Sequence, residues 1–150
     1  MRANIQEIFL MNKILVYTDG GSRGNPGPSG CGVYITDSNG VPIERRHKFI
    51  GYATNNIAEY TAAFLGINRA IELGAEEILF YADSELLIKQ LTGVYKIKNP
   101  ELKKIAGEIT TRIQDWGGKI SFTHIFREQN KEADRLSNVA MDEGKKLAKL

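Results

Sequence analysis

The chain has 150 residues, 42% of them hydrophobic, and a formal net charge of +2 at pH 7. This length predicts one domain over residues 1–150, with residues 1–12 as an N-terminal extension. A net charge so close to zero excludes neither a nucleic-acid partner nor a small substrate, but it gives no support for nucleic-acid binding by itself. No apolar run reaches the roughly 18 residues that a membrane-spanning helix needs, so no membrane span is expected.

The single cysteine, Cys31, cannot form a disulfide within the chain. Its place in a strand-like run predicts a small buried residue rather than a nucleophile. A chain with one cysteine fits a reducing compartment best. The first residues, MRANIQEIFLMNK, are too short and too polar for a secretory signal. We therefore expect a cytoplasmic protein.

Three strands are expected in the first third of the chain. Residues 13–18 read as a strand, residues 21–30 as a loop rich in Gly, Pro and Ser, and residues 31–37 as a second strand. A turn at SNG (38–40) leads to a third strand at about 41–50.

A helix follows, capped by Thr54 or Asn55 and ended just before Gly74. Its apolar residues recur at helical spacing, at Ile57, Tyr60, Phe64, Ile67 and Ile71. A row of small residues beside this stripe, Ala63, Gly66 and Ala70, would let the helix lie close to the sheet.

The second half alternates strands and helices. We predict a strand at 76–83, a short helix at 84–91, a helix from Pro100 to about Trp116, a strand at 119–125 and a helix at about 130–146. This order predicts an α/β fold, a mixed sheet with helices on both faces, in which strands one, three and four run parallel. Their carboxyl ends meet at one edge, where α/β folds usually place their sites.

Four separated carboxylates are the candidate site: Asp19, Glu59, Asp83 and Asp134. Each has an ordinary explanation, as a turn residue, a helix N-cap or a carboxylate near a helix N-terminus. Those explanations do not require all four acids to lie at one sheet edge. If the fold gathers them there, two carboxylates about 4 Å apart would repel each other by about 4 kcal/mol. A bound Mg²⁺, which prefers oxygen ligands, would relieve this repulsion.

The local sequences around these acids resemble type 1 ribonuclease H from about residue 13 to about residue 141. The matching pieces are T-D-G-G-S-x-G-N-P-G-P at 18–28, T-N-N-x-x-E at 54–59, D-S at 83–84 and N-x-x-x-D at 130–134. The resemblance implies the ribonuclease H-like fold, with a five-stranded sheet of order 3-2-1-4-5. It also implies cleavage of the RNA strand of RNA/DNA hybrids, leaving 5′-phosphate and 3′-hydroxyl ends, with the four acids as the catalytic residues.

Phosphodiester hydrolysis needs an activated water and a stabilised leaving oxygen, which two metal ions about 4 Å apart supply. We expect Mg²⁺, with Mn²⁺ as the alternative, and two ions per site with substrate. Asp19 is the candidate to bridge both ions. Glu59 and Asp83 would complete the ligands of one ion, and Asp134 those of the other.

The resemblance also implies substrate contacts. Asn55 and Asn56 match amides that read the minor groove of the hybrid, where 2′-hydroxyls distinguish RNA from DNA. Asn25, Thr54 and Ser84 match positions that hold a DNA-strand phosphate, although a purely local turn role for Asn25 stays open. Gly20, which follows Asp19, would leave room for a ligand to approach.

The chain departs from the family pattern in two places. The segment LTGVYKIKNPELKK is too short for the basic protrusion of many members, so we expect substrate binding either to be weaker or to rest on Lys96, Lys98 and Tyr95. Where the family has a mobile histidine before the last helix, this chain has HIFREQN. Arg127 is the candidate for that auxiliary role and His124 is the rival. An arginine would hold phosphate or aid release, because it cannot act as a general acid.

The main alternative is a non-catalytic module that binds RNA/DNA hybrids, which would tolerate loss of an acid. Activity on double-stranded RNA stays open, and a monomer without an obligate protein partner is expected.

Overall fold

The computed structural model describes residues 12–148, so residues 1–11 of the predicted N-terminal extension lie outside the described part. The strands are β1 (Lys13–Ser22), β2 (Gly27–Asp37), β3 (Pro42–Ala53), β4 (Glu77–Ala82) and β5 (Lys119–His124). The helices are α2 (Asn55–Glu72), α3 (Glu85–Leu91), α4 (Pro100–Trp116) and α5 (Lys131–Ala148), with a short 3-10 turn, η1, at Arg127–Gln129.

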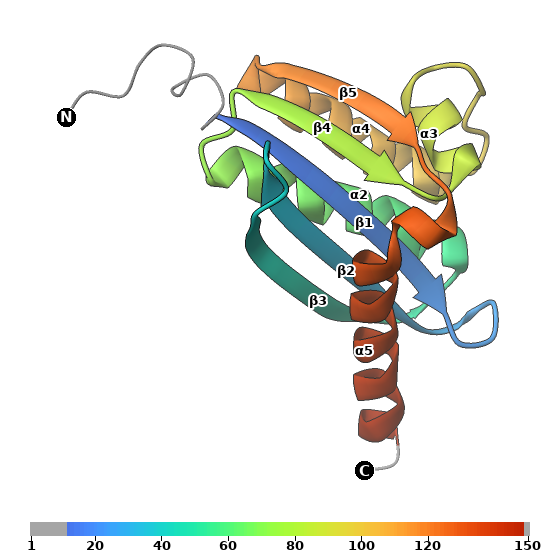
Figure 1. Cartoon of the computed structure of the whole chain (residues 1–150). Coiled ribbons are helices and arrows are strands. Elements are labelled where there is room, and N and C mark those ends of the chain that lie inside the picture. The colour runs from blue at the N-terminus through green and yellow to red at the C-terminus, as the bar shows by residue number, and fades with distance from the viewer. Residues whose placement is uncertain (1–11, 149–150) are drawn as a thin grey trace.

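The five strands form one mixed sheet in the order β3-β2-β1-β4-β5, which confirms the predicted fold. β2 pairs antiparallel with β1 and β3, whereas β4 pairs parallel with β1 and β5. Strands β1, β3, β4 and β5 therefore point the same way, and their carboxyl ends share one edge. Helix α5 covers one face of the sheet, while α2 and α4 cover the other (Figure 1).

The first hairpin is longer than predicted. β1 continues through Ser22 and β2 begins at Gly27, so the loop is confined to residues 23–26 rather than 21–30. The pairing of β1 with β2 continues as far as Ser22 opposite Ser29. The glycines in this stretch do not interrupt it, because a glycine has the same backbone N–H and C=O groups for strand pairing as other residues. β3 likewise extends to Ala53, beyond the expected end at residue 50.

Helix boundaries follow the predicted signals. Thr54 rather than Asn55 caps α2, because the Thr54 hydroxyl accepts a hydrogen bond from the Ile57 N–H at 3.2 Å. Gly74, just beyond α2, has a φ of +90°, a left-handed conformation that favours glycine at a helix end.

No helix within residues 12–148 has both the length and the apolar character to cross a membrane.

The main core lies between the sheet and α2. Its strand residues include Val16 and Phe80, and its helix residues include Tyr60 and Ile67, all fully or almost fully buried. A Cβ on Gly66 would lie 2.7 Å from Thr18 Cγ2, so the predicted row of small residues does bring α2 against β1. Cys31 is also buried, and burial raises the pKa of its thiol to about 12, in line with a structural role.

Candidate metal and nucleic-acid site

Three of the four predicted acids meet at the carboxyl edge of the sheet. Asp19, Glu59 and Asp83 each offer an oxygen, and these atoms all lie within 4.8 Å of one another. The pairing of the central strands explains part of this geometry. Thr18 opposite Ala82 is the last pair between β1 and β4, so Asp19 and Asp83 each lie one residue beyond it.

Close packing of α2 brings Glu59 to the two aspartates. A Cβ on Gly20 would lie 2.2 Å from the Ala58 carbonyl carbon and 2.5 Å from the Glu59 nitrogen. Helix α2 therefore fills the space where a side chain at position 20 would lie, and the part of Gly20 in substrate binding stays a prediction. The Gly20 N–H donates a hydrogen bond to the Glu59 carboxylate.

Asp134 lies in the first turn of α5, outside the group of three. Its charge still acts on Asp19, whose pKa it helps to raise. Asn138, one turn further along, donates a hydrogen bond to the Asp134 carbonyl oxygen at 2.9 Å, and its amide lies 3.4 Å from Asp134 Oδ1. Arg23, from the loop after β1, donates to Asn138 Oδ1 at 2.9 Å and pairs with Asp142 at 3.0 Å. The loop after β1 is thus attached to the helix that carries Asp134.

The acidic cluster has the electrostatic character of a cation site. Burial raises the pKa of Asp19 to about 7, and the like charges of Asp83 and Asp134 add to the rise against the hydrogen bond from Ser137. Burial and the charge of Asp19 also raise the pKa of Glu59 well above its ordinary value. Within residues 12–148, Glu59 Oε2 is a buried oxygen without a hydrogen-bond partner. Carboxylate oxygens that lack other partners fit a hard divalent cation such as Mg²⁺.

Two buried polar residues that support the acids were not assigned roles from the sequence. Asn130 donates to Asp83 Oδ2 at 3.1 Å, and Ser137 Oγ lies 2.6 Å from Asp19 Oδ2. Only 2% of Asn130 and none of Ser137 is exposed. A polar side chain among the apolar positions of the last helix is the signal that could have singled out Ser137.

Two of the predicted substrate-binding residues, Asn25 and Asn55, join the first hairpin to the start of α2. Asn25 Oδ1 accepts a hydrogen bond from the Asn55 N–H at 3.0 Å, and Asn55 Oδ1 accepts one from the Ser22 N–H at 2.7 Å. Asn25 therefore acts beyond its own turn. Asn55 and Asn56 are both exposed in the first turn of α2, at the same end of the helix as Glu59.

Ser84 is the N-cap of α3, where its hydroxyl accepts from the Leu87 N–H at 3.2 Å. This cap leaves Asp83 free of the capping role that its position suggested. Lys96 and Lys98 are exposed in the segment between α3 and α4. His124 is the last residue of β5, and Arg127 is exposed at the start of η1. The strand position of His124 agrees with the prediction, and the role of Arg127 stays a prediction.

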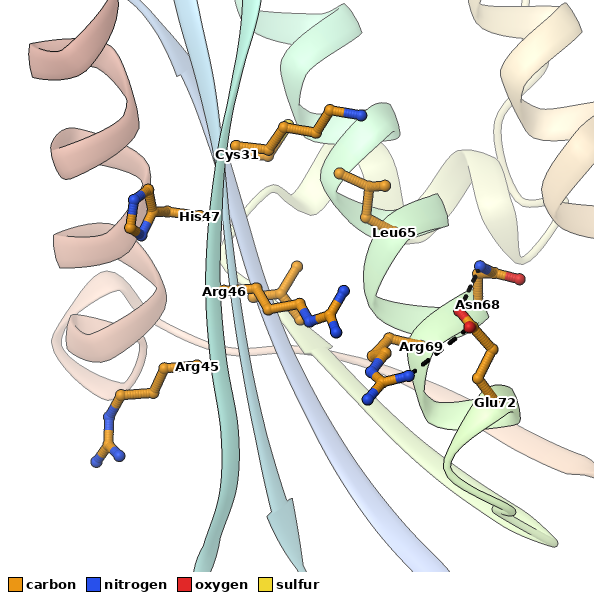
Figure 2. Close-up of a pocket in the computed structure, with 10 residues that line it drawn as sticks. Cys31, Arg45, Arg46, His47, Leu65, Asn68, Arg69 and Glu72 are labelled. Carbon is orange, nitrogen blue, oxygen red and sulfur yellow. Dashed lines mark hydrogen bonds and ion pairs between the residues drawn. The ribbon is translucent and has the colours of Figure 1, made fainter.

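A groove of about 490 Å³ lies between β3 and α2 and is lined by basic side chains. Figure 2 shows Arg46 on the α2 side of β3, whereas Arg45 and His47 point toward the helix on the opposite face. These groups have acidic partners within the chain. Glu44 pairs with Arg46 at 3.1 Å and with Arg69 at 2.7 Å, and Arg45 pairs with Glu132 at 3.0 Å. The basic groups therefore attach β3 to the two helices.

Residues 17–140 match the family model described as Reverse transcriptase-like. The bifunctional protein Rv2228c of Mycobacterium tuberculosis is 38% identical over 131 residues, covering 87% of this chain and 36% of that protein. Ribonuclease HI of Halobacterium salinarum is 38% identical over 134 residues, covering 87% of this chain and 65% of that protein. The crystal structure of LC11-RNase H1 in complex with an RNA/DNA hybrid is 41% identical, with a TM-score of 0.83 over 87% of this chain and 97% of that chain.

The chain spans only 36% and 65% of the length of the mycobacterial and halobacterial relatives. It nevertheless covers nearly all of the LC11 structure at a similar level of identity. The strand order and the acidic cluster agree with the resemblance found in the sequence. The chain therefore belongs to the type 1 ribonuclease H family.

Proposed function

We propose that this chain is a divalent-metal-dependent endoribonuclease that hydrolyses the RNA strand of RNA/DNA hybrids and leaves 5′-phosphate and 3′-hydroxyl ends. The observation that carries the proposal is the convergence of Asp19, Glu59 and Asp83, from three different elements, within 4.8 Å. The similarity to a ribonuclease H1 whose structure contains an RNA/DNA hybrid supports the choice of substrate.

In this proposal Asp19, Glu59, Asp83 and Asp134 hold two Mg²⁺ ions in the presence of substrate, and Mn²⁺ is the alternative cation. When bound, such ions activate a water molecule and stabilise the leaving oxygen. Asp19 is near enough to Asp83 and Asp134 for the charges of both to add to the rise that burial causes in its pKa. This position supports Asp19 as the ligand shared by both ions.

The polar residues around the cluster would orient the hybrid. Asn55 and Asn56 lie at the start of the helix that carries Glu59, where neutral amides suit base edges and 2′-hydroxyls. Asn25, Thr54 and Ser84 would contact a DNA-strand phosphate, and Lys96 and Lys98 would add positive charge. Arg127 would hold a phosphate or aid product release. The buried cysteine without a disulfide, Cys31, supports a reducing compartment, and we propose the cytoplasm. We also propose that the protein is a monomer.

A non-catalytic hybrid-binding module is the second candidate, because the same polar residues would serve binding alone. The raised pKa values of Asp19 and Glu59 favour the enzyme. A binding module has no need for repelling carboxylates in a partly buried cluster, and perturbed pKa values gather at functional sites.

Cleavage of an RNA strand labelled at its 5′ end tests the proposal. We expect cleavage of the RNA/DNA hybrid with Mg²⁺ and none in excess EDTA, with duplex DNA of the same sequence as the control. Hybrid binding without cleavage in either Mg²⁺ or Mn²⁺ would favour the binding module. Cleavage that persists in EDTA would refute the role of the acidic cluster.

A further inference from the structure

The hydroxyl of Ser137 lies between two residues of the acidic site. Ser137 Oγ is 2.6 Å from Asp19 Oδ2 and 2.9 Å from the Asp134 carbonyl oxygen. A hydroxyl has one proton, so it donates to one of these acceptors at a time. An ionised carboxylate at the shorter distance is the stronger acceptor. A serine within a helix ordinarily donates to a carbonyl in the preceding turn, so the bond to Asp19 is additional to what α5 requires.

Glycines on β2 make this contact geometrically available. Gly32 is the residue paired with Asp19 across β1 and β2. A Cβ on Gly32 would lie 2.6 Å from the Ser137 nitrogen and 2.2 Å from the Ala133 carbonyl oxygen. Helix α5 therefore lies directly on β2 beside Asp19, close enough for the short side chain of Ser137 to reach the carboxylate on the neighbouring strand.

We propose that Ser137 is a positioning residue that holds one oxygen of Asp19, and so sets the direction in which the other oxygen meets a divalent cation. The inference rests on the proposed function, since it concerns the same metal site. A metal-ligating carboxylate is generally hydrogen-bonded in this way, and loss of such a partner typically costs about 10–100-fold in metal affinity or activity. Asn130 makes an equivalent contact with Asp83.

The alternative is that Ser137 only satisfies the Asp134 carbonyl and fills space in the packing of α5. Thr36→Val is the matched control, because Thr36 is 2% exposed and its hydroxyl donates to the Asp37 carbonyl oxygen near the far end of β2. Both substitutions remove a buried hydroxyl that bonds to a nearby carbonyl, but only Ser137 contacts an acid of the cluster.

The experiment is calorimetric titration of Mn²⁺ into wild-type protein, Ser137→Ala, Ser137→Cys and Thr36→Val, without nucleic acid. We expect Ser137→Ala to weaken Mn²⁺ binding about 10-fold and Thr36→Val to leave it unchanged. Ser137→Cys should lie between wild type and Ser137→Ala, because a thiol is a weak donor. In hybrid cleavage, the Mn²⁺ concentration for half-maximal rate should rise in Ser137→Ala while KM for the hybrid stays the same.

Wild-type Mn²⁺ affinity in a folded Ser137→Ala protein would overturn the inference and leave the proposed function standing. If Ser137→Ala does not fold, Ser137→Cys decides, and wild-type affinity in that variant would overturn the inference equally. Wild-type protein that neither binds Mn²⁺ nor cleaves hybrid would overturn the proposed function and this inference together.

Discussion

Asn130 donates one hydrogen bond to Asp83 Oδ2 at 3.1 Å and another to the Thr18 carbonyl oxygen at 2.9 Å. This single amide, just before α5, therefore joins the ends of the two central parallel strands, β1 and β4. It fixes one acid of the cluster directly, and it satisfies a backbone group next to another, Asp19.

Asn130→Ala should reduce both stability and cleavage. It leaves the Thr18 carbonyl without this donor, which typically costs about 1–3 kcal/mol, and it frees Asp83 to rotate, which should slow cleavage about 10–100-fold. Urea unfolding and hybrid cleavage measure the two effects. The control is Asn99→Ala, which removes the N-cap of α4 and should cost about 1 kcal/mol with cleavage preserved. Equal loss of activity in both variants would mean that destabilisation alone explains the effect.

Asp19→Asn should abolish cleavage while hybrid binding persists. The substitution removes a metal ligand but keeps an oxygen that accepts from Ser137. We expect activity to fall by more than about 100-fold, beyond the usual effect of losing only a partner of a ligand. The measurements are cleavage rate and hybrid affinity on the same preparation. Wild-type turnover in the variant would refute the assignment of Asp19.

The same variant should be more stable than wild type when metal is absent. Removing the charge relieves the cost of burying an ionised carboxylate and its repulsion with Asp83 and Asp134. Urea unfolding in EDTA should therefore show a higher midpoint for Asp19→Asn, and saturating Mg²⁺ should reverse the order. A lower midpoint in EDTA would show that the cluster is not under electrostatic strain.

Without metal, stability should fall as pH rises from about 4 to about 7. The pKa of Asp19 is raised from 3.8 to about 7, so in this range the folded protein holds a proton that the unfolded chain has lost. Stability then decreases with a slope of about 1.4 kcal/mol per pH unit for this group. Urea unfolding in EDTA at pH 5 and pH 7 measures the slope, which should be smaller in Asp19→Asn. An unchanged slope in that variant would assign the pH dependence to other groups.

Gly20→Ala should displace Glu59. The added Cβ would lie 2.2 Å from the backbone of Ala58, so α2 must move away from β1, at a cost of about 1–3 kcal/mol. Cleavage should be lost with Glu59 out of place. The matched control is Gly107→Ala in α4, where a Cβ meets no atom within 4 Å and helix propensity should add about 0.5–1 kcal/mol of stability. Retained cleavage in Gly20→Ala would argue against the importance of the close approach.

Much of the molecule is encoded in local signals along the chain. Pro100 and the Gly117 end of α4, the apolar stripe of α2 and the SNG turn each act over a few residues, and the structure contains the elements they predict. The four acids could be named because each lies in a characteristic local sequence. The α/β order of elements then limits where their strands can end, and Asp19 and Asp83 do lie at the same edge.

The contacts that complete the site depend on residues far apart in sequence. Ser137 reaches Asp19 only because Gly32 lets α5 lie against β2, and the space beside Gly20 is filled by α2. Thr54 caps α2, while Asn55 Oδ1 accepts a hydrogen bond from the N–H of Ser22 at the distant end of β1. Propensity and periodicity report on neighbours along the chain. The partner of a buried hydroxyl is set by the distance between two packed elements, and that distance depends on the whole fold.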